Sequence, residues 1–434
     1  MSDALPGALD AAGLGRLLAR PGVAACLDAL RAEGEETRLV GGCVRDALLG
    51  REGADIDLAT TVPPGETLAR GRRAGLKAVP TGFDHGTVTL VVAGVPHEVT
   101  TLREDVETDG RHAVVRFGRD FARDAERRDF TINALSLGDD GRLHDTVGGV
   151  VDLAAARVRF IGDPGTRILE DGLRILRFFR FHARYGTGAP DPAGLAASIR
   201  LRDRLDRLSR ERVRSELLRL LVAPGAVDAV SVLSGTGLLG RLTGGVGDLG
   251  RLARAADTAD ADGDPAIARL AALAVQSRPD ADRLRDRLRL ANEEHARRAA
   301  YAAALTALRT RASLDAAGAR ALAAMHGMPA LRDALAGIDG EPRPSIGADA
   351  RAALADLGVG AALPPFPITG ADLVAAGVPA GPAIGRGLAA ARKLWLDQGC
   401  PAGTEVRDGL LGEALSVARA ASTETVAAHA PKRA

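Results

Sequence analysis

The pattern of apolar and polar residues changes character along this 434-residue chain. Before residue 160, short strand-like runs alternate with brief helical or loop segments. From Ile168 onward, apolar residues recur almost entirely at helical spacing, and residues 1–38 also have a helical pattern. The strand-like runs are TRLVGG, DIDLAT, GTVTLVV, HEVTTL and INALSL. The pattern therefore predicts a small domain built around one sheet, followed by an all-helical part.

Glycine and proline mark the expected domain boundaries. The composition changes near Phe160, near Ala223 and around residues 341–347, where EPRPSIG interrupts helical sequence. We find no repeat of fixed period, which argues against a solenoid. The expected parts are 1–160, 161–223 and 224–434.

Composition narrows the class of protein. Hydrophobic residues make up 46% of the chain and charged residues 26%, as is typical of soluble globular proteins. The formal net charge is only +1, so any affinity for nucleic acid depends on a local basic face. The three cysteines show no paired spacing, which favours a reducing cytoplasm over a disulfide framework or a zinc site. No apolar run is long enough to cross a bilayer, so no membrane partner is expected.

The most informative stretch is LVGGCVRDALLGREGADIDLAT, residues 39–60. A glycine pair before a helix lets backbone N–H groups approach an anion closely, and the helix N-terminus favours negative charge. Asp55 and Asp57 are two residues apart on an expected strand, so both carboxylates face the same side and can hold hard cations. A phosphate cradle beside paired carboxylates indicates metal-assisted nucleotidyl transfer. The candidate triphosphate-binding residues are Gly41, Gly42, Arg45 and Asp46.

Two further segments add candidate residues to this sheet. HEVTTLRED carries Glu98 among apolar neighbours, where a carboxylate is costly unless it is paired or metal-bound, so Glu98 is the candidate third catalytic carboxylate. An ion pair on an edge strand is the alternative for this residue. The segment from Arg103 to Arg128 is charge-dense, and its first half is expected to be a mobile loop. In RRDFTINALSL, guanidinium forks and an amide suit phosphate oxygens and ribose hydroxyls. The candidate nucleotide-binding residues there are Arg127, Arg128, Asp129 and Asn133.

The run ILEDGLRILRFFRFHARYG is expected to form one helix that reads a nucleotide base. A carboxylate only accepts hydrogen bonds and a guanidinium only donates them, so Asp171 and Arg174 together match the pairing edges of cytosine and adenine. Uracil and guanine present the reverse order, and each unpaired group costs about 1–3 kcal/mol. An ordinary salt-bridged helix face is the alternative interpretation. The candidate base-reading residues are Glu170, Asp171, Arg174 and Arg177.

The segment SRERVRSELLRLL begins with a possible helix N-cap. We expect it to brace the base-reading helix, with some arginines free to meet a phosphate backbone. A solvated amphipathic helix is the alternative. The supporting residues are Ser209, Arg212 and Glu216.

Taken together and in this order, these motifs resemble the bacterial class II tRNA nucleotidyltransferases (CCA-adding enzymes) and poly(A) polymerases. The resemblance extends closely from about Arg38 to Leu221 and more loosely to the tail FPITGADLVAAGVPAGPAIGRGLAAARKLWLDQGC. Its other segments are PTGFDHGTVTLVV, HDTVGGVVDL and RFIGDP. Two departures are Gly172, where the family usually has proline, and GTRIL in place of a charged run.

The resemblance implies an α+β fold with a nucleotidyltransferase head containing a mixed sheet of about five strands, followed by a helical neck, body and tail. It also implies template-independent addition of CCA to the 3′ end of tRNA from CTP and ATP, with release of pyrophosphate. In the family, the carboxylates matching Asp55 and Asp57 bind two Mg²⁺ ions per site, and the groups matching Asp171 and Arg174 read the base. The body and tail are expected to bind tRNA, and the oligomeric state stays open.

Several alternatives remain at this point. Within the family, they are a poly(A) polymerase, which the weakly basic tail disfavours, and an enzyme that adds only CC or only A. Outside it, they are a catalytically inactive RNA-binding protein, disfavoured by the retained aspartates, and a nucleotidyltransferase acting on small molecules, which leaves the Arg-rich helices without a role.

Overall fold

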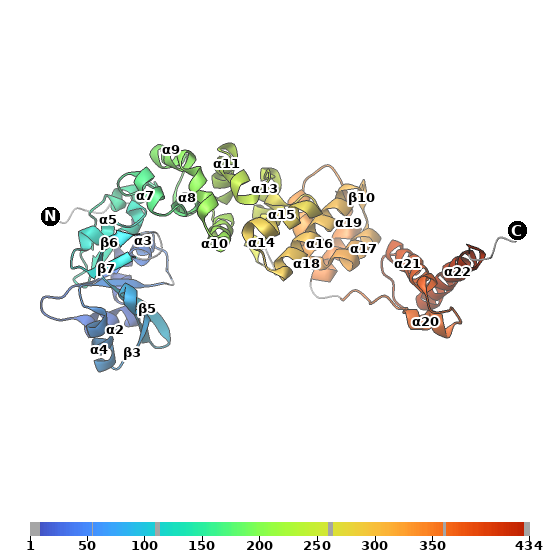
Figure 1. Cartoon of the computed structure of the whole chain (residues 1–434), viewed down its shortest axis with the longest axis horizontal. Helices are drawn as coiled ribbons and strands as arrows, with labels where there is room; N and C mark the ends of the chain where they lie inside the picture. Colours follow the sequence, from blue (N-terminus) through green and yellow to red (C-terminus); the bar gives the residue numbers. More distant parts are fainter. Residues whose placement is uncertain (1–8, 54, 109–112, 259–263, 359–361, 429–434) are drawn as a thin grey trace. The chain divides into compact units, whose positions relative to one another are not determined.

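The computed structural model describes residues 9–53, 55–108, 113–258, 264–358 and 362–428 (Figure 1). The chain divides into two compact units, Met1–Leu242 and Thr243–Ala434. This division falls after the boundary expected near Ala223, and the three-part division expected from composition stays a prediction. The first unit holds all the candidate site residues.

A mixed sheet forms the centre of the first unit. Its strand order is β3-β4-β5-β2-β1-β8-β9, with β2 and β5 parallel and every other neighbouring pair antiparallel. The mixed sheet confirms the expected fold class, although it has seven strands rather than about five. The two edge strands were missed because β3 lacks clear alternation and β9 has two residues. The strands are β1 (Thr37–Val40), β2 (Asp57–Thr60), β3 (Lys77–Gly82), β4 (Thr87–Val92), β5 (Val95–Thr101), β8 (Ser136–Gly138) and β9 (Leu143–His144).

The segment expected to begin as a mobile loop instead contains two paired strands. β6 (Arg103–Thr108) and β7 (Ala113–Phe117) are antiparallel and form a separate two-stranded sheet. The expectation of a loop is therefore wrong for these residues. The sequence AVVRF contains adjacent β-branched residues, which favour a strand, and the dense charges around it hid that preference.

Helices cover one face of the main sheet and continue beyond it. α2 and α4 contact β3, β4 and β5, where Val88, Leu90 and Val99 are fully buried. Gly22 permits this approach, because a Cβ there would lie 2.4 Å from the His97 ring. The helices are α1 (Ala11–Leu18), α2 (Pro21–Leu30), α3 (Gly42–Leu48), α4 (Pro64–Arg73), α5 (Phe121–Glu126), α6 (Gly149–Ala154), α7 (Pro164–Glu170), α8 (Arg174–Tyr185), α9 (Pro192–Arg200), α10 (Arg210–Leu221), α11 (Ala226–Gly235) and α12 (Leu238–Thr243). Short 3₁₀ turns are η1 (Phe83–His85), η2 (Thr131–Asn133) and η3 (Arg202–Arg207).

An aromatic cluster attaches α8 to the sheet domain. Phe130 and Phe160 form an isolated bridge next to the sheet, and their ring centroids lie 4.9 Å apart. Phe178 of α8 stacks on Phe160 at 5.4 Å, and Phe181 lies 5.2 Å from Phe130. Such ring pairs add about 0.5–1.5 kcal/mol each beyond the area they bury. These four phenylalanines thus pack α8 against the sheet domain.

The second unit is helical apart from β10 (Ser313–Leu314) and β11 (Ser345–Ile346), which pair in parallel. Its C-terminal helices enclose a core that contains Leu373, Trp395 and Leu410. Its helices are α13 (Leu249–Asp257), α14 (Pro265–Ala274), α15 (Arg278–Leu288), α16 (Asn292–Arg309), α17 (Ala316–His326), α18 (Met328–Ile338), α19 (Ala348–Gly358), α20 (Gly370–Ala375), α21 (Pro382–Asp397) and α22 (Thr404–Ala428). Within the described ranges of both units, none of the helices has the length and apolar character that a bilayer crossing requires.

Candidate active site

Three carboxylates gather on the exposed face of the main sheet. Asp57 is the first residue of β2 and lies in register with Glu98 on the parallel strand β5. Asp55 precedes the strand, and Ile56, between the two aspartates, is 7% exposed. Asp55, Asp57 and Glu98 are all exposed, as the alternation of a half-buried strand predicts. The apolar environment expected for Glu98 is wrong, because its neighbour Val99 points to the opposite, buried face.

Repulsion among these three carboxylates affects the pKa of Asp57. Its carboxyl has a raised pKa, first because of partial desolvation and then because of the nearby negative charges of Glu98 and Asp55. The guanidinium of Arg128 opposes these effects. A cluster of like charges is unfavourable by itself, and a bound cation would relieve the repulsion.

The donor set suits a metal ion that also binds a substrate. Among the described residues, no group of three or more His, Cys, Asp or Glu side chains forms a protein-only metal cage. Mg²⁺ rarely uses such a cage and is usually bound by one or two carboxylates together with substrate phosphates. Asp55, Asp57 and Glu98 therefore offer the hard oxygen ligands that this mode of binding needs.

A glycine and an arginine lie beside the carboxylates. Gly41 adopts φ +75° immediately before α3, and a Cβ there would lie 2.8 Å from Nη1 of Arg128. Arg128 donates from Nη2 to Asp124 at 3.0 Å, and Arg127 donates from Nε to the same carboxylate at 2.9 Å. Asp124 is buried, whereas both arginines remain partly exposed. The guanidinium of Arg128 is thus fixed by protein partners but still accessible, and it partly offsets the negative charge of Asp57.

Arg45 and Asp46 lie in a buried network of side chains, and their direct contact with a phosphate stays a prediction. Arg45 is only 6% exposed, and each of its three side-chain nitrogens already donates to a protein group. Nε donates to Asp46 at 2.9 Å, Nη1 to Asn133, and Nη2 to the Tyr185 hydroxyl at 2.6 Å. The Tyr185 hydroxyl in turn donates to Asp46 at 3.1 Å. The sequence pattern could not reveal this, because Asn133 and Tyr185 are distant in the chain.

Asp129 and Asn133 belong to the same buried network rather than to an open ribose pocket. One oxygen of Asp129 accepts from the backbone N–H of Phe130 at 2.9 Å and from Nδ2 of Asn133 at 3.0 Å. The other accepts from Nε of Arg177 at 2.7 Å. With both oxygens engaged and 8% exposure, Asp129 is not available to a ligand in this arrangement. The ribose contact of Asp129 and Asn133 thus stays a prediction, while Arg128 keeps an accessible position.

The candidate base-reading residues lie at a junction between two helices, not on one continuous helix. α7 ends at Glu170, and Asp171 is extended before α8 starts at Arg174. The break follows from Gly172, where a Cβ would lie 2.9 Å from Cβ of Arg204 and 3.0 Å from its carbonyl oxygen. The expectation of one helix is wrong here, because glycine permits a close approach that a longer residue would block.

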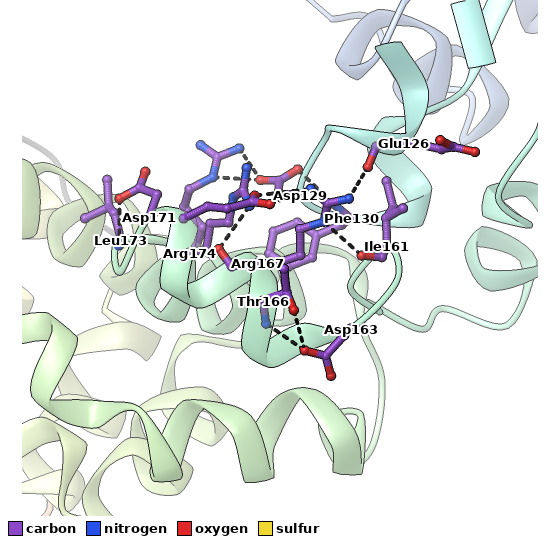
Figure 2. Close-up of polar contacts among 12 residues, drawn as sticks. Glu126, Asp129, Phe130, Ile161, Asp163, Thr166, Arg167, Asp171, Leu173 and Arg174 are labelled. Carbon is purple, nitrogen blue, oxygen red and sulfur yellow. Dashed lines mark hydrogen bonds and ion pairs between the residues drawn. The ribbon is translucent and has the colours of Figure 1, made fainter. Parts of the chain in front are cut away.

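Asp171 and Arg174 each have a different partner. Arg174 forms an ion pair with Glu170 and donates to the Arg167 carbonyl at 3.0 Å. Asp171 accepts from the backbone N–H of Leu173 at 3.0 Å and from Nη2 of Arg212 at 2.8 Å. The two side chains are therefore oriented separately at the edge of the junction (Figure 2).

The segment expected to brace this junction does contact it. Ser209 is the N-cap of α10 and accepts from the Arg212 backbone at 3.4 Å. Arg212 reaches Asp171, and the buried Glu216 accepts from Nε of Arg180 on α8 at 2.6 Å. Sequence reasoning missed Tyr185, for which no local signal exists. It also missed Asp124, although its spacing of three and four residues from Arg127 and Arg128 was a usable signal.

One cysteine lies directly beneath the carboxylates. Cys43 of α3 is buried, and its Sγ lies 3.4 Å from the Val40 carbonyl and 3.9 Å from the Asp57 carbonyl. Burial raises the pKa of this thiol to about 11. The thiol therefore stays protonated and packs α3 against the start of β2.

Two segments of the chain match models of known protein families. Residues 37–159 match the family model described as the poly A polymerase head domain. Residues 189–243 match the model described as a probable RNA and SrmB-binding site of polymerase A.

Whole proteins and solved structures give a concordant result. The chain is 44% identical over 206 residues to the mitochondrial CCA tRNA nucleotidyltransferase 1 of Danio rerio, covering 47% of this chain and 48% of that protein. It is 39% identical over 223 residues to the CCA-adding enzyme of Levilactobacillus brevis, covering 51% and 54%. The chain thus spans about half the length of the curated relatives it matches. The crystal structure of the Bacillus stearothermophilus CCA-adding enzyme in complex with CTP aligns with 92% of this chain and 94% of that one, at 26% identity and a TM-score of 0.64.

Proposed function

Because this chain resembles CCA-adding enzymes and poly(A) polymerases in sequence and fold, we propose that it adds CCA to the 3′ end of tRNA. The substrates are CTP and ATP, no nucleic-acid template is used, and pyrophosphate is released. The names of the relatives and the CTP complex of a similar structure support this choice over a poly(A) polymerase.

We assign metal binding to the carboxylates of Asp55 and Asp57, with Glu98 as a third carboxylate. These residues would hold two Mg²⁺ ions, which lower the pKa of the attacking ribose hydroxyl and neutralise charge on the triphosphate. The observation that carries the proposal is the pairing of Asp57 with Glu98 in register on one exposed face, beside Asp55. Without a cationic partner such a cluster would only destabilise the fold.

Arg128 and the turn at Gly41 are assigned to the phosphates. Arg128 donates to Asp124 from Nε and Nη2 and to the Asn133 carbonyl from Nη1, yet its side chain keeps 26% exposure and its charge acts on Asp57. A guanidinium suits phosphate oxygens because it offers several N–H donors in one plane. Any side chain at Gly41 would displace this guanidinium.

Base choice is assigned to Asp171 and Arg174. Glu170 orients the guanidinium of Arg174, and Arg212 orients the carboxylate of Asp171. An acceptor and a donor held separately in this way match the pairing edges of cytosine and adenine. Arg177 acts on this choice indirectly, since it is engaged with Asp129.

The proposal is tested with a tRNA that lacks its last three nucleotides. The protein is incubated with this tRNA, Mg²⁺ and each NTP singly or in pairs, and the products are sized on a gel. We expect extension by three nucleotides with CTP plus ATP, and no extension by the Asp57→Asn variant. A long ladder with ATP alone would identify a poly(A) polymerase instead, and no extension under any condition would reject RNA nucleotidyl transfer.

A second test addresses base choice. We expect Arg174→Ala to reduce the preference for CTP over UTP by one to two orders of magnitude, because an unpaired group costs about 1–3 kcal/mol. The affinity for tRNA, measured by filter binding, should change far less. Unaltered discrimination between CTP and UTP would remove Arg174 from the base-reading site. Arg73 of α4, an exposed arginine that also pairs with a glutamate of its own helix, provides a matched control as Arg73→Ala.

The partners that follow are tRNA and the two nucleotides. A cytoplasmic location remains our proposal from the cysteine pattern, although three of the relatives are named as mitochondrial proteins.

A further inference from the structure

A closed circuit of side chains joins α3 of the sheet domain to α8. Arg45 of α3 donates to Asn133, Asn133 donates to Asp129, and Asp129 accepts from Arg177 of α8. Aromatic rings of α8 complete the connection from Arg177 back to Arg45. The guanidinium of Arg177 lies 5.3 Å from the Phe181 centroid, and Phe181 stacks on Tyr185 at 5.7 Å.

Tyr185 completes the circuit at Arg45. Its hydroxyl accepts from Nη2 of Arg45 at 2.6 Å and donates to Asp46 at 3.1 Å. The guanidinium of Arg45 also lies 4.0 Å from the centroid of the Tyr185 ring. Hydrogen bonds to charged groups are roughly twice as strong as neutral ones, and burial strengthens them further.

α3 also contacts the backbone of Asp57, one of the candidate catalytic residues. Cys43, two residues before Arg45, packs its Sγ against the carbonyl oxygen of Asp57 at 3.9 Å. The turn that follows α3 is closed by a hydrogen bond from the Arg51 N–H to the Asp46 carbonyl at 2.8 Å, and this turn leads toward Asp55. A shift of α3 would therefore move the carboxylates directly.

The opposite end of the circuit is the start of α8. Arg177 lies one helical turn after Arg174, so the two residues are on neighbouring positions of the same helix face. The circuit consequently connects the residue assigned to base reading with the residues assigned to metal binding.

We propose that Arg45 and Tyr185 are positioning residues that set nucleotide selection by holding the start of α8 in a defined place relative to Asp57. The inference rests on the proposed nucleotidyl transfer and extends it to two buried residues that touch no substrate. A short helix that contacts the backbone of Asp57 and contributes Arg45 to the circuit transmits the alignment. If the contact of either Arg45 or Tyr185 is loosened, the site accepts bases whose pairing edge does not match Asp171 and Arg174.

The Tyr185→Phe variant tests this directly, since it removes one hydroxyl and keeps the ring stacked on Phe181. Tyr301→Phe is the matched control, because Tyr301 is also buried and its hydroxyl also accepts from an arginine, at 3.4 Å from Arg251 in the second unit. Both variants are made in the full chain. The measurements are kcat and KM for CTP and for UTP on the truncated tRNA, the KM for tRNA, and the midpoint of thermal unfolding.

We expect Tyr185→Phe to lower the preference for CTP over UTP by about fivefold to tenfold, the factor that corresponds to one buried hydrogen bond. The loss of preference should appear in kcat, because the variant alters how the start of α8 is aligned with Asp57. The KM for tRNA should stay within about twofold of the parent, because RNA binding is not altered. Arg45→Lys should lower the preference further, since an ammonium cannot donate to Asn133 and Tyr185 in one plane. Tyr301→Phe should shift only the unfolding midpoint.

The outcomes separate the two proposals. If the parent extends tRNA and Tyr185→Phe keeps the parental preference, the positioning role is wrong and Tyr185 serves stability alone. The same conclusion follows if Tyr301→Phe alters the preference equally. If the parent extends no RNA, the proposed function fails and this inference fails with it.

Discussion

Each unit of the molecule contains a buried arginine beside a buried tyrosine, and the two pairs are connected very differently. In the first unit, Arg45 reaches Asn133 and Tyr185, which are 88 and 140 residues away. In the second, Arg251 is fully buried and forms its ion pair with Asp248, three residues earlier, at 2.8 Å. Its Nη1 donates to the Val275 carbonyl at 2.9 Å and reaches Tyr301 at 3.4 Å.

The difference indicates what each pair does. Arg251 bonds mainly to Asp248 at the start of its own helix and to the Val275 carbonyl, so it stabilises the packing of helices. Arg45 holds together the sheet domain and α8, on which separate parts of the candidate active site lie. Substitutions at the two arginines should therefore differ more in activity than in stability.

The largest effect is expected from removing each guanidinium. Arg45→Ala leaves Asp46 buried without its cation, which should reduce the free energy of unfolding of the first unit by about 3–5 kcal/mol. Arg251→Ala should cost less, because the Asp248 side chain keeps 28% exposure and can be hydrated. Trp395, the one tryptophan of the chain, lies in the second unit, so its fluorescence follows only that unit while circular dichroism follows both.

Urea unfolding of the two variants checks this contrast. Arg45→Ala should shift the dichroism transition and leave the Trp395 fluorescence transition unchanged. Arg251→Ala should shift the Trp395 fluorescence transition together with the second unit's share of the dichroism change. A common shift in both variants would show that the units unfold together and would remove the basis of the comparison.

A smaller effect is expected from adding a methyl group beside each arginine cluster. Gly41→Ala places a Cβ at φ +75° and 2.8 Å from Arg128, so we expect about 1–3 kcal/mol of strain and a marked loss of nucleotide transfer. Gly337→Ala, in helix α18, places a Cβ 3.3 Å from the Tyr301 hydroxyl. Helix propensity offsets that contact, so stability should change by less than about 1 kcal/mol. Full activity of Gly41→Ala would contradict the assignment of this turn to the phosphates.

The smallest effect concerns acid pH. Burial alone would raise the pKa of Asp124, but Arg128 and Arg127 hold it below its usual value. The pKa of Asp248 is likewise lowered, because hydrogen bonds from Arg251 outweigh desolvation. A depressed pKa contributes stability above about pH 4, and this stability is lost as the pH falls through the folded-state pKa.

Thermal unfolding between pH 7 and pH 3 tests the two aspartates separately. Asp124→Asn should flatten the acid-induced loss seen by dichroism, and Asp248→Asn should flatten the loss seen by Trp395 fluorescence. Unchanged pH profiles in both variants would show that other carboxyl groups control acid unfolding.

The parts of the site that could be predicted from sequence are those whose geometry is local. Asp55 and Asp57 face the same side because strand alternation spans three residues, and Ser209 caps α10 because a cap acts within one turn. The presence of one sheet before residue 160 also followed from short apolar runs. In each case the pattern and the structure it determines lie in the same few residues.

The parts that could not be predicted depend on contacts distant in sequence. Nothing near Arg45 signals that Tyr185 will cover it, and a guanidinium beside two glycines resembles a phosphate ligand until its burial is known. At Gly172, periodicity favoured one helix, whereas the approach of Arg204 decided the break. Asp129 was assigned to the ribose for the same reason, since the arrival of Arg177 from α8 is invisible in the motif.

The placement of the cysteines has a practical consequence. Cys26, Cys43 and Cys400 are all buried and unpaired, and burial raises the pKa of Cys26 to about 12 and that of Cys43 to about 11. Thiolates are the species that react with maleimides, so the folded chain should resist such reagents at neutral pH. A spin label or fluorophore can then be attached at a newly introduced surface cysteine on α8 or α10 with the native thiols left in place. Distances between labels on these two helices would report any movement of α8 relative to α10 within the first unit.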